Sequence, residues 1–217
     1  EVVLNSFQIL GKLGENTMKF EIVVSIPVRD ENFLYVDGMW NEFRIDFYNG
    51  NMENLIEKLN MIDKKIVTLR DRDEGGFYTG NIDDKMDFLK KVKNGIIDIE
   101  IKHLDNIDRE FFKDRRLILS AHKFNGSFTL KEIENFLQYS DLGLIKIAMK
   151  MEKAEDFIDV ALENRGRLLF VDLSANVGNR ILFSLISGTF FYTYLNEKIA
   201  DGQIHFKKAL RILESIE

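Results

Sequence analysis

Short apolar segments alternate with helical patterns along most of this chain, and that alternation limits the folds open to it. Each apolar segment is rich in β-branched or aromatic residues, which is typical of a buried strand. Eight such segments occur, FEIVVSIPV at 20–28, EFRIDFY at 42–48, KIVTLR at 65–70, GIIDIEI at 95–101, RLILSA at 116–121, LGLIKIAM at 142–149, RLLFVDL at 167–173 and RILFSLI at 180–186. Helical patterns lie between several of them, at 54–62, 84–95, 129–140 and 154–166. Strands that alternate with helices form a parallel sheet covered by those helices.

The number of strands favours a closed barrel over an open doubly wound sheet. No GxGxxG or P-loop follows the first strand, which also weighs against the open, nucleotide-binding alternative. We predict an α/β fold, a (β/α)8 TIM barrel that forms one compact domain over residues 1–217. A barrel of about 250 residues is typical, so the connections here must be short. Residues 1–17 are expected to be a plug beneath the barrel or a segment added for expression.

Composition excludes several classes of function. The chain has no cysteine, which rules out disulfides and thiolate chemistry, and its net charge of −6 argues against a nucleic-acid-binding face. No apolar stretch reaches the roughly 18 residues of a membrane span, and no secretory signal opens the chain. We expect a cytoplasmic protein that binds neither nucleic acid nor membrane.

Charged side chains stand within or just after several predicted strands, where the carboxyl ends of barrel strands build an active site. Glu42, Arg44 and Asp46 alternate along the second strand, so that they share one side of the sheet. Arg70 ends the third strand and Glu74 follows four residues later. The fourth strand carries Asp98 and Glu100, for which a salt bridge with a barrel-lining arginine is the commoner explanation and a metal site the rarer one.

Lys146 is the most informative single residue. The segment LIKIAM places it among apolar neighbours, where a lysine is almost never buried unless it is paired or functional. Burial favours the neutral amine, the form that attacks a carbonyl and forms a Schiff base. The alternative is a side chain that extends from the barrel mouth into solvent.

The remaining candidates are weaker when each is taken alone. His122 follows a strand in ILSAHKFNGS, where a lone histidine is more often a core residue than a working one. Arg180 follows SANVGN, and Gln203 lies in a loop before the last helix; the guanidinium suits a substrate carboxylate. His103 and His205 are interpreted as surface or helix residues.

Taken in order, these segments resemble one family, type I 3-dehydroquinate dehydratase, over about residues 20 to 210. The segments that carry the likeness are VSIPV (24–28), EFRID (42–46), TLRDRDEGG (68–76), LSAHKF (119–124) and IKIAM (145–149), with a weaker match in GTFFYTY (188–194). The resemblance implies dehydration of 3-dehydroquinate to 3-dehydroshikimate in aromatic amino acid biosynthesis, with no metal or organic cofactor. It also implies a homodimer.

The resemblance assigns roles to nine residues. Lys146 would form the Schiff base, His122 would act as general acid and base, and Glu74 would orient the imidazole. The implied substrate-binding residues are Ser25, Glu42, Arg44, Arg70, Arg180 and Gln203. This chain departs from the family in two places: VDLSANVGNR lacks the usual Met-Gly pair, and Ile199 and Asp201 replace the hydroxyl residue and the proline of the lid motif.

Three other interpretations remain open at this point. A class I aldolase or transaldolase also uses a barrel lysine, although the histidine and Glu-Gly-Gly motifs belong to the dehydratase pattern. A metal-dependent barrel could use Asp46, Asp98 and Glu100. A catalytically decayed barrel kept for binding is suggested by Ile199 and by the altered stretch 171–179.

Overall fold

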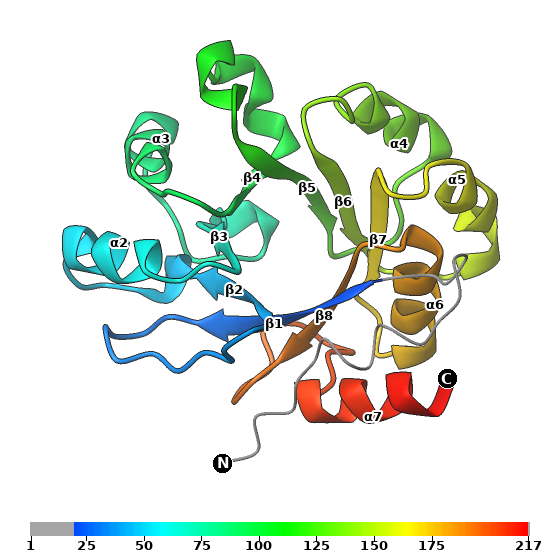
Figure 1. The fold of residues 1–217 in the computed structure, drawn as a ribbon. Coiled ribbons are helices and arrows are strands. Elements are labelled where there is room, and N and C mark those ends of the chain that lie inside the picture. Colours follow the sequence, from blue (N-terminus) through cyan, green and yellow to red (C-terminus); the bar gives the residue numbers. More distant parts are fainter. Residues whose placement is uncertain (1–19, 217) are drawn as a thin grey trace.

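The structure is a computed structural model, and it describes residues 20–216. Eight parallel strands form one sheet in the order β7-β6-β5-β4-β3-β2-β1-β8, with helices around the outside (Figure 1). The strands are β1 Glu21–Pro27, β2 Trp40–Arg44, β3 Lys65–Thr68, β4 Ile96–Glu100, β5 Arg116–Lys123, β6 Leu144–Met149, β7 Leu168–Asp172 and β8 Phe190–Tyr194. The predicted TIM barrel is confirmed. No pairing joins β7 to β8 among the described residues, so the barrel is nearly closed.

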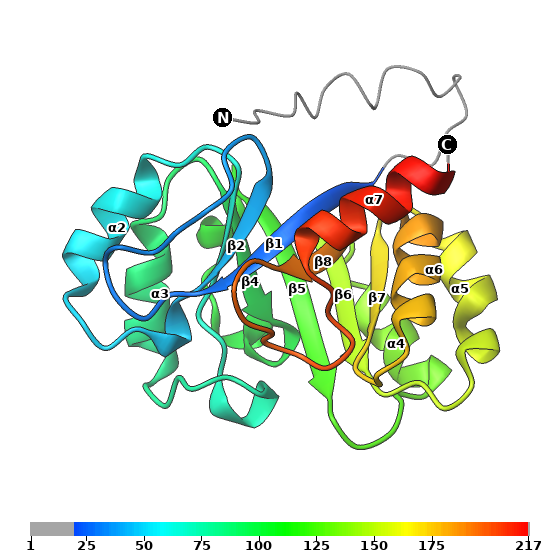
Figure 2. The ribbon, with the colours of Figure 1, turned by 90° about the horizontal axis from the view of Figure 1, so that it is seen from below.

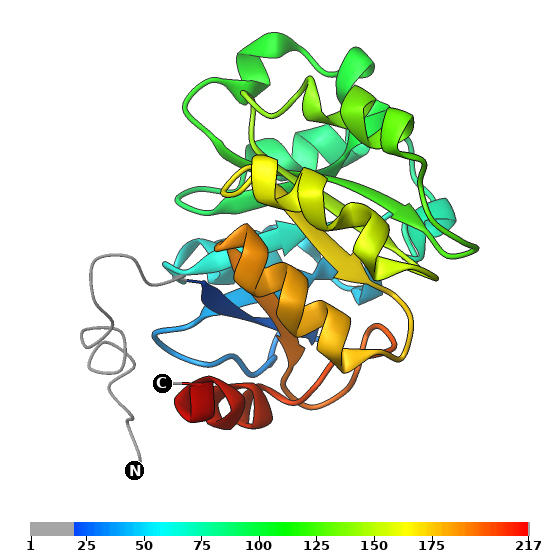
Figure 3. The same cartoon turned by 90° about the vertical axis from the view of Figure 1, so that its right-hand side faces the viewer.

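The outer helices bury their apolar faces on the sheet. They are α2 Met52–Asn60, α3 Ile82–Lys90, α4 Leu130–Leu137, α5 Ile158–Glu163, α6 Val177–Ser187 and α7 Phe206–Ile216. Figure 3 shows α5 and α6 lying over the strands of the second half of the barrel. Only 3-10 turns join β4 to β5, and no helix joins β1 to β2, which explains how the barrel fits in a short chain. Among the described residues, no helix has both the length and the apolar character needed to cross a membrane.

The inside of the barrel is layered because alternate residues of every strand point inward. The layer nearer the amino ends of the strands is apolar, and its residues pack in one cluster. They include Trp40, Ile66, Ile96, Ile118, Leu169 and Phe190. Two residues further along the strands, the inward side chains become polar: Glu42 follows Trp40, Asp98 follows Ile96, and Ser120 follows Ile118. The apolar layer therefore closes the barrel beneath a polar layer at the carboxyl ends of the strands.

One of the eight predicted strands is wrong. RILFSLI at 180–186 lies within α6, and the eighth strand is β8, in the segment GTFFYTY. Asn176 caps α6 by accepting a hydrogen bond from the Asn179 backbone N–H, and Gly188 ends the helix with φ +66°. A short apolar run does not distinguish a buried helix from a buried strand, and for this reason the segment 180–186 was wrongly predicted as a strand.

Strand ends differ slightly from the prediction elsewhere. β2 ends at Arg44, and Asp46 lies in the 3-10 turn Ile45–Phe47 rather than in the strand. The loops that follow the strands gather on one side of the barrel, where the β8–α7 connection also folds back (Figure 2). That side is the carboxyl end of the parallel sheet. The predicted plug, residues 1–17, lies outside the described residues.

Candidate active site

A cavity opens at the carboxyl ends of the strands. Its lining residues come from five strands, from the connections that follow β3, β5, β7 and β8, and from α6. They are Glu42, Arg44, Arg70, Glu74, Gly75, His122, Phe124, Lys146, Ala148, Val171, Leu173, Arg180, Tyr192, Ile199, Ala200 and Gln203. Eight of the nine residues assigned by resemblance are in this set, which places them around one space. The ninth, Ser25, lies outside the lining.

Lys146 reaches the cavity from the middle of β6 and is almost fully buried, at 4% exposure. Its Nζ donates a hydrogen bond to Oδ2 of Asp98 and lies 3.7 Å from Oε1 of Glu42. The ammonium group therefore has internal counter-charges, so the buried lysine is paired rather than extended into solvent. Its position in a cavity leaves it accessible to a small molecule.

Asp98 connects Lys146 to Arg70. Nη2 of Arg70 donates to Oδ1 of Asp98 over 2.6 Å, and the Ser120 hydroxyl donates to the same oxygen over 2.6 Å. Burial alone would raise the pKa of Asp98, but Arg70 and Lys146 hold it well below its usual range. The carboxylate stays ionised and anchors the Lys146 side chain. The predicted pairing of Asp98 with a barrel-lining arginine is confirmed.

His122 lies near the end of β5 and pairs with Glu74 from the loop after β3. Its Nδ1 is 2.9 Å from Oε2 of Glu74. Burial lowers the pKa of His122 well below its ordinary value, and the cations of Arg70 and Lys146 lower it further. Burial also raises the pKa of Glu74 to about 7, although Arg70 opposes that shift. A neutral imidazole that donates its Nδ1–H to Glu74 keeps a free lone pair on Nε2, as a general base requires.

Gly75 fixes the turn that carries Glu74. Its φ is +78°, a conformation that favours glycine, and a Cβ atom there would lie 2.2 Å from the Phe124 ring. The glycine therefore allows Phe124 to pack directly against the backbone beside Glu74.

Arg180 enters the cavity from the first turn of α6 and is 3% exposed. One Nη2 donates to the carbonyl of Asp201 over 2.6 Å, while its buried Nε has no hydrogen-bond partner among the described residues. Burial lowers the pKa of Arg180 to about 10, and Asp172 and Asp201 offset part of that effect. It remains a cation at neutral pH, with one N–H donor that no described residue satisfies.

The other two arginines are more fully committed to internal carboxylates. Arg44 donates to both oxygens of Asp46, each over 2.8 Å, and Arg70 pairs with Asp98 and, at 3.2 Å, with Glu100. Arg180 is thus the lining arginine best able to accept a new carboxylate. The pairing of Arg70 with two carboxylates of β4 depends on which strands are neighbours, so no sequence pattern could have provided it.

Ser25 lies behind the cavity and connects two lining residues. Its hydroxyl donates to Oε2 of Glu42 over 2.7 Å and accepts from Nε2 of Gln203 at 3.4 Å. Gln203 also accepts hydrogen bonds from the backbone N–H groups of Ile199 and Ala200 through its Oε1. This geometry suits a positioning role for Ser25; its contact with a substrate stays a prediction.

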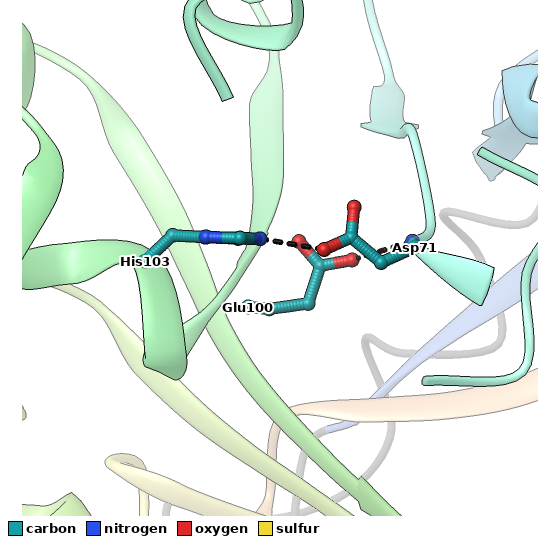
Figure 4. Close-up of side chains that lie close together, drawn as sticks. All are labelled: Asp71, Glu100 and His103. Atoms are coloured by element: carbon teal, nitrogen blue, oxygen red, sulfur yellow. Dashed lines mark hydrogen bonds and ion pairs between the residues drawn. The ribbon is translucent and has the colours of Figure 1, made fainter. Parts of the chain in front are cut away.

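A second polar cluster lies beside the cavity, where Asp71, Glu100 and His103 converge (Figure 4). One ligand atom from each residue falls within 4.8 Å of the others, a spacing compatible with a metal ion. Two lysines already provide positive charge there. Nζ of Lys85 donates to Asp71 and Glu100 over 2.8 Å and 2.5 Å, and Nζ of Lys102 lies 2.9 Å from Asp71.

The residues of the metal-dependent alternative are compensated by cationic side chains in the same way. Asp46 pairs with Arg44, Asp98 with Arg70 and Lys146, and Glu100 with Arg70 and Lys85. His103, interpreted from sequence as a surface or helix residue, is half-buried in a 3-10 turn and contacts Asp71 at 2.6 Å. These charges form a structural ion-pair network rather than an open ligand set.

Comparison with known proteins agrees with this geometry. The family model described as "Type I 3-dehydroquinase" matches residues 40–217. A 3-dehydroquinate dehydratase of Saccharolobus solfataricus is 30% identical over 211 residues, which covers 90% of this chain and 94% of the relative. One of Metallosphaera sedula is 30% identical over 204 residues, with 90% and 97% covered.

Solved structures give the same fold. The 3-dehydroquinate dehydratase of Geobacillus kaustophilus superposes with a TM-score of 0.76 at 18% identity, covering 90% of each chain. A type I enzyme of Clostridium difficile superposes with a TM-score of 0.73 at 22% identity, covering 90% of this chain and 91% of that one. From the extent of the family match and the identity to its curated relatives, this chain belongs to the type I 3-dehydroquinase family.

Proposed function

We propose that this protein dehydrates 3-dehydroquinate to 3-dehydroshikimate through a Schiff base on Lys146. The observation that carries the proposal is the meeting, in one cavity, of a buried lysine, a half-buried His–Glu pair and a buried arginine with an unpartnered donor. A ketone, an acidic α-proton and a carboxylate are the substrate groups that these three features would engage. The relatives named as 3-dehydroquinate dehydratases support this choice of substrate.

Substrate binding would begin with the carboxylate. Arg180 donates to it from the α6 side of the cavity, and the low dielectric of the buried site strengthens that contact. Glu42, Arg44, Arg70 and Gln203 line the remaining walls and supply hydrogen bonds to the substrate hydroxyls. The lack of a carboxylate partner for the Arg180 Nε makes this end of the cavity the anion-binding end.

The covalent step takes place at Lys146. The ammonium group transfers one proton to the ketone oxygen as Nζ adds to the carbonyl carbon, and loss of water from the resulting protonated carbinolamine leaves an iminium ion. Asp98, which already accepts a hydrogen bond from Nζ, would stabilise the positive charge that the iminium retains. The iminium withdraws electrons from the neighbouring carbon and makes its proton acidic.

His122 would then perform two proton transfers. Its Nε2 removes the α-proton to form an enamine, while Glu74 stabilises the resulting imidazolium through Nδ1. The imidazolium returns that proton to the departing hydroxyl, which leaves as water and restores a conjugated iminium. Hydrolysis of this iminium releases the enone product and regenerates Lys146, so the net change is the loss of one water molecule.

Reductive trapping tests the proposal directly. Borohydride added with the substrate should leave a covalent adduct on Lys146, identified by peptide mass spectrometry, and turnover followed by the absorbance of the enone should be lost in Lys146→Met. Lys123→Met is the matched control, because Lys123 follows His122 on β5 but does not line the cavity. Turnover by Lys146→Met comparable to the wild type would contradict the mechanism.

We also propose that the enzyme acts as a cytoplasmic homodimer. The support for this is the family resemblance. Sedimentation equilibrium at micromolar concentration measures the assembly. A mass equal to one chain across the concentration range would contradict the dimer.

A further inference from the structure

Tyr192 carries a buried hydroxyl group that makes no hydrogen bond to any residue that the structure describes. The residue lies in the middle of β8 and is 6% exposed. Its hydroxyl has no hydrogen-bond partner among residues 20–216. A buried phenol usually finds a partner, since leaving one unsatisfied costs on the order of 1–3 kcal/mol. An exception of this kind calls for an explanation.

The surroundings of Tyr192 point to the cavity. Its side chain is part of the lining, together with Lys146 and Arg180. The ring centroid lies 4.8 Å from Nζ of Lys146, so the ring packs against the group proposed to bond the substrate. Arg180, which lines this cavity and also a small adjoining void together with Tyr192, has a second unpartnered donor, its buried Nε. Two unpartnered polar groups therefore share one wall.

The position of Tyr192 follows from the alternation along β8. Phe190, two residues earlier, points into the apolar layer that closes the barrel, and Tyr192 is the next inward residue. A phenylalanine there would complete the apolar packing equally well. The hydroxyl group is the only part of the side chain that packing leaves unexplained.

We propose that Tyr192 is a substrate-binding residue that donates a hydrogen bond to a substrate oxygen at the Lys146 end of the cavity. This inference rests on the proposed function. Burial raises the pKa of Tyr192 well above its ordinary value, and the nearby carboxylates of Glu42 and Asp98 raise it further. The phenol therefore stays protonated throughout the working range and acts as a donor.

Tyr192→Phe removes the hydroxyl and keeps the ring, so that the contact with Lys146 survives. We expect kcat/KM for 3-dehydroquinate to fall about tenfold, the usual range for a neutral hydrogen bond. Tyr194→Phe is the control: it removes the same atom from the same strand at a residue that does not line the cavity, and it should leave kcat/KM unchanged. Borohydride trapping on Lys146 should still occur in both variants.

The results separate this inference from the proposed function. If the wild type turns over and forms the adduct while Tyr192→Phe keeps the wild-type kcat/KM, the role of Tyr192 is overturned and the function stands. If the wild type forms no adduct, the function fails. A second measurement uses only the wild-type protein, so it does not depend on whether a variant folds. In labelled protein, the 13Cζ resonance of Tyr192 should shift when 3-dehydroshikimate is added. A resonance unmoved at saturation would overturn the inference.

Discussion

Lys146 and Arg180 both place a cation against the cavity, yet their surroundings differ in a way that matches their proposed roles. Lys146 is held by Asp98, which fixes the direction of its side chain. Arg180 meets the backbone carbonyl of Asp201 and keeps a free Nε–H. A group that forms a covalent bond must be held in place. A group that binds an anion needs a positive charge and an N–H donor that no internal carboxylate already occupies. The two sites thus define the orientation in which a keto acid would lie.

The role proposed for Glu74, to stabilise the imidazolium form of His122, gives a prediction about the pH dependence of turnover. Only the ionised carboxylate can stabilise the imidazolium, and the pKa of Glu74 is about 7. We expect kcat of the wild type to rise with pH through about 7. In Glu74→Gln, kcat should fall and that rise should disappear. Profiles of kcat from about pH 5 to about pH 9 on both proteins measure this; a wild-type profile flat through pH 7 would argue against the role of Glu74.

The same carboxyl group lowers the stability of the fold at alkaline pH. Its folded pKa of about 7 lies above the ordinary 4.5, so the folded chain binds this proton more tightly than the unfolded chain. The resulting stabilisation is complete below about pH 4.5 and is lost as the pH rises to about 7. Glu74→Gln should therefore raise the free energy of unfolding at about pH 8, by up to about 3 kcal/mol. Urea unfolding at that pH tests it, and a destabilised Glu74→Gln would contradict it.

The residues of the site were more predictable than their contacts. Lys146 stands out in a single segment because an isolated lysine in an apolar strand has few explanations. His122 and Glu74, by contrast, gained their interpretation only from a resemblance in motif order. Tyr192 was missed, since a tyrosine in an aromatic run resembles core, and only the geometry shows that its hydroxyl is unpartnered. Pairings such as Asp98 with Arg70 depend on which strands are neighbours.

Among the elements, α6 shows the limit of reading periodicity. Its apolar run predicted a strand, but the signals at its ends were those of a helix, with Asn176 before it and Gly188 after it. Those end signals, and a span too long for an average strand, could have identified it. The correction matters for the site, because Arg180 reaches the cavity from the first turn of this helix and not from a strand.

The side chain of Gln203 braces the β8–α7 connection, which has Asp201 where the family resemblance implies a proline. The Gln203 side chain accepts from the Ile199 and Ala200 backbone N–H groups, at 2.8 Å and 3.2 Å. Gly202 adopts φ +72°, and a Cβ atom there would lie 2.6 Å from the Ser174 carbonyl oxygen. The backbone of the loop is thus braced without the implied proline.

Ile199→Ser should improve substrate binding. Ile199 lines the cavity where the family resemblance implies a hydroxyl, so a serine would restore one hydrogen bond to the substrate. We expect KM for 3-dehydroquinate to fall about two- to tenfold with little change in kcat. Ile199→Val, which stays apolar, should behave like the wild type. A rise in KM for Ile199→Ser would show that this chain uses the apolar contact instead.

At the scale of the whole molecule, the barrel was predictable because its strands are buried on both faces and read as continuous apolar runs. The compact length was also expected, but its cause was not: the connections after β1 and β4 lack α-helices. Loops without helical periodicity carry no pattern from which to infer this. The polar layer of the barrel depends on ion pairs that join residues far apart in sequence, such as Lys85 and Glu100.

Lys85→Met tests how much the fold depends on this network. The Lys85 side chain is fully buried, and its ammonium group binds Glu100 over 2.5 Å and Asp71 over 2.8 Å (Figure 4 shows the two carboxylates). Removing the ammonium group leaves Glu100 with Arg70 and Asp71 with Lys102 as the remaining cationic partners, so we expect the free energy of unfolding to fall by up to about 3–5 kcal/mol. Urea denaturation provides the measurement. Lys90→Met, an exposed position on the same helix α3, is the control and should change little.

A double variant distinguishes charge from packing as the cause. The double variant combines Lys85→Met with Glu100→Gln, so the carboxylate charge that loses its Lys85 partner is removed as well. The loss of stability should therefore be smaller than in Lys85→Met alone. An equal or larger loss in the double variant would mean that the buried stem of Lys85, and not its charge, supports this part of the barrel.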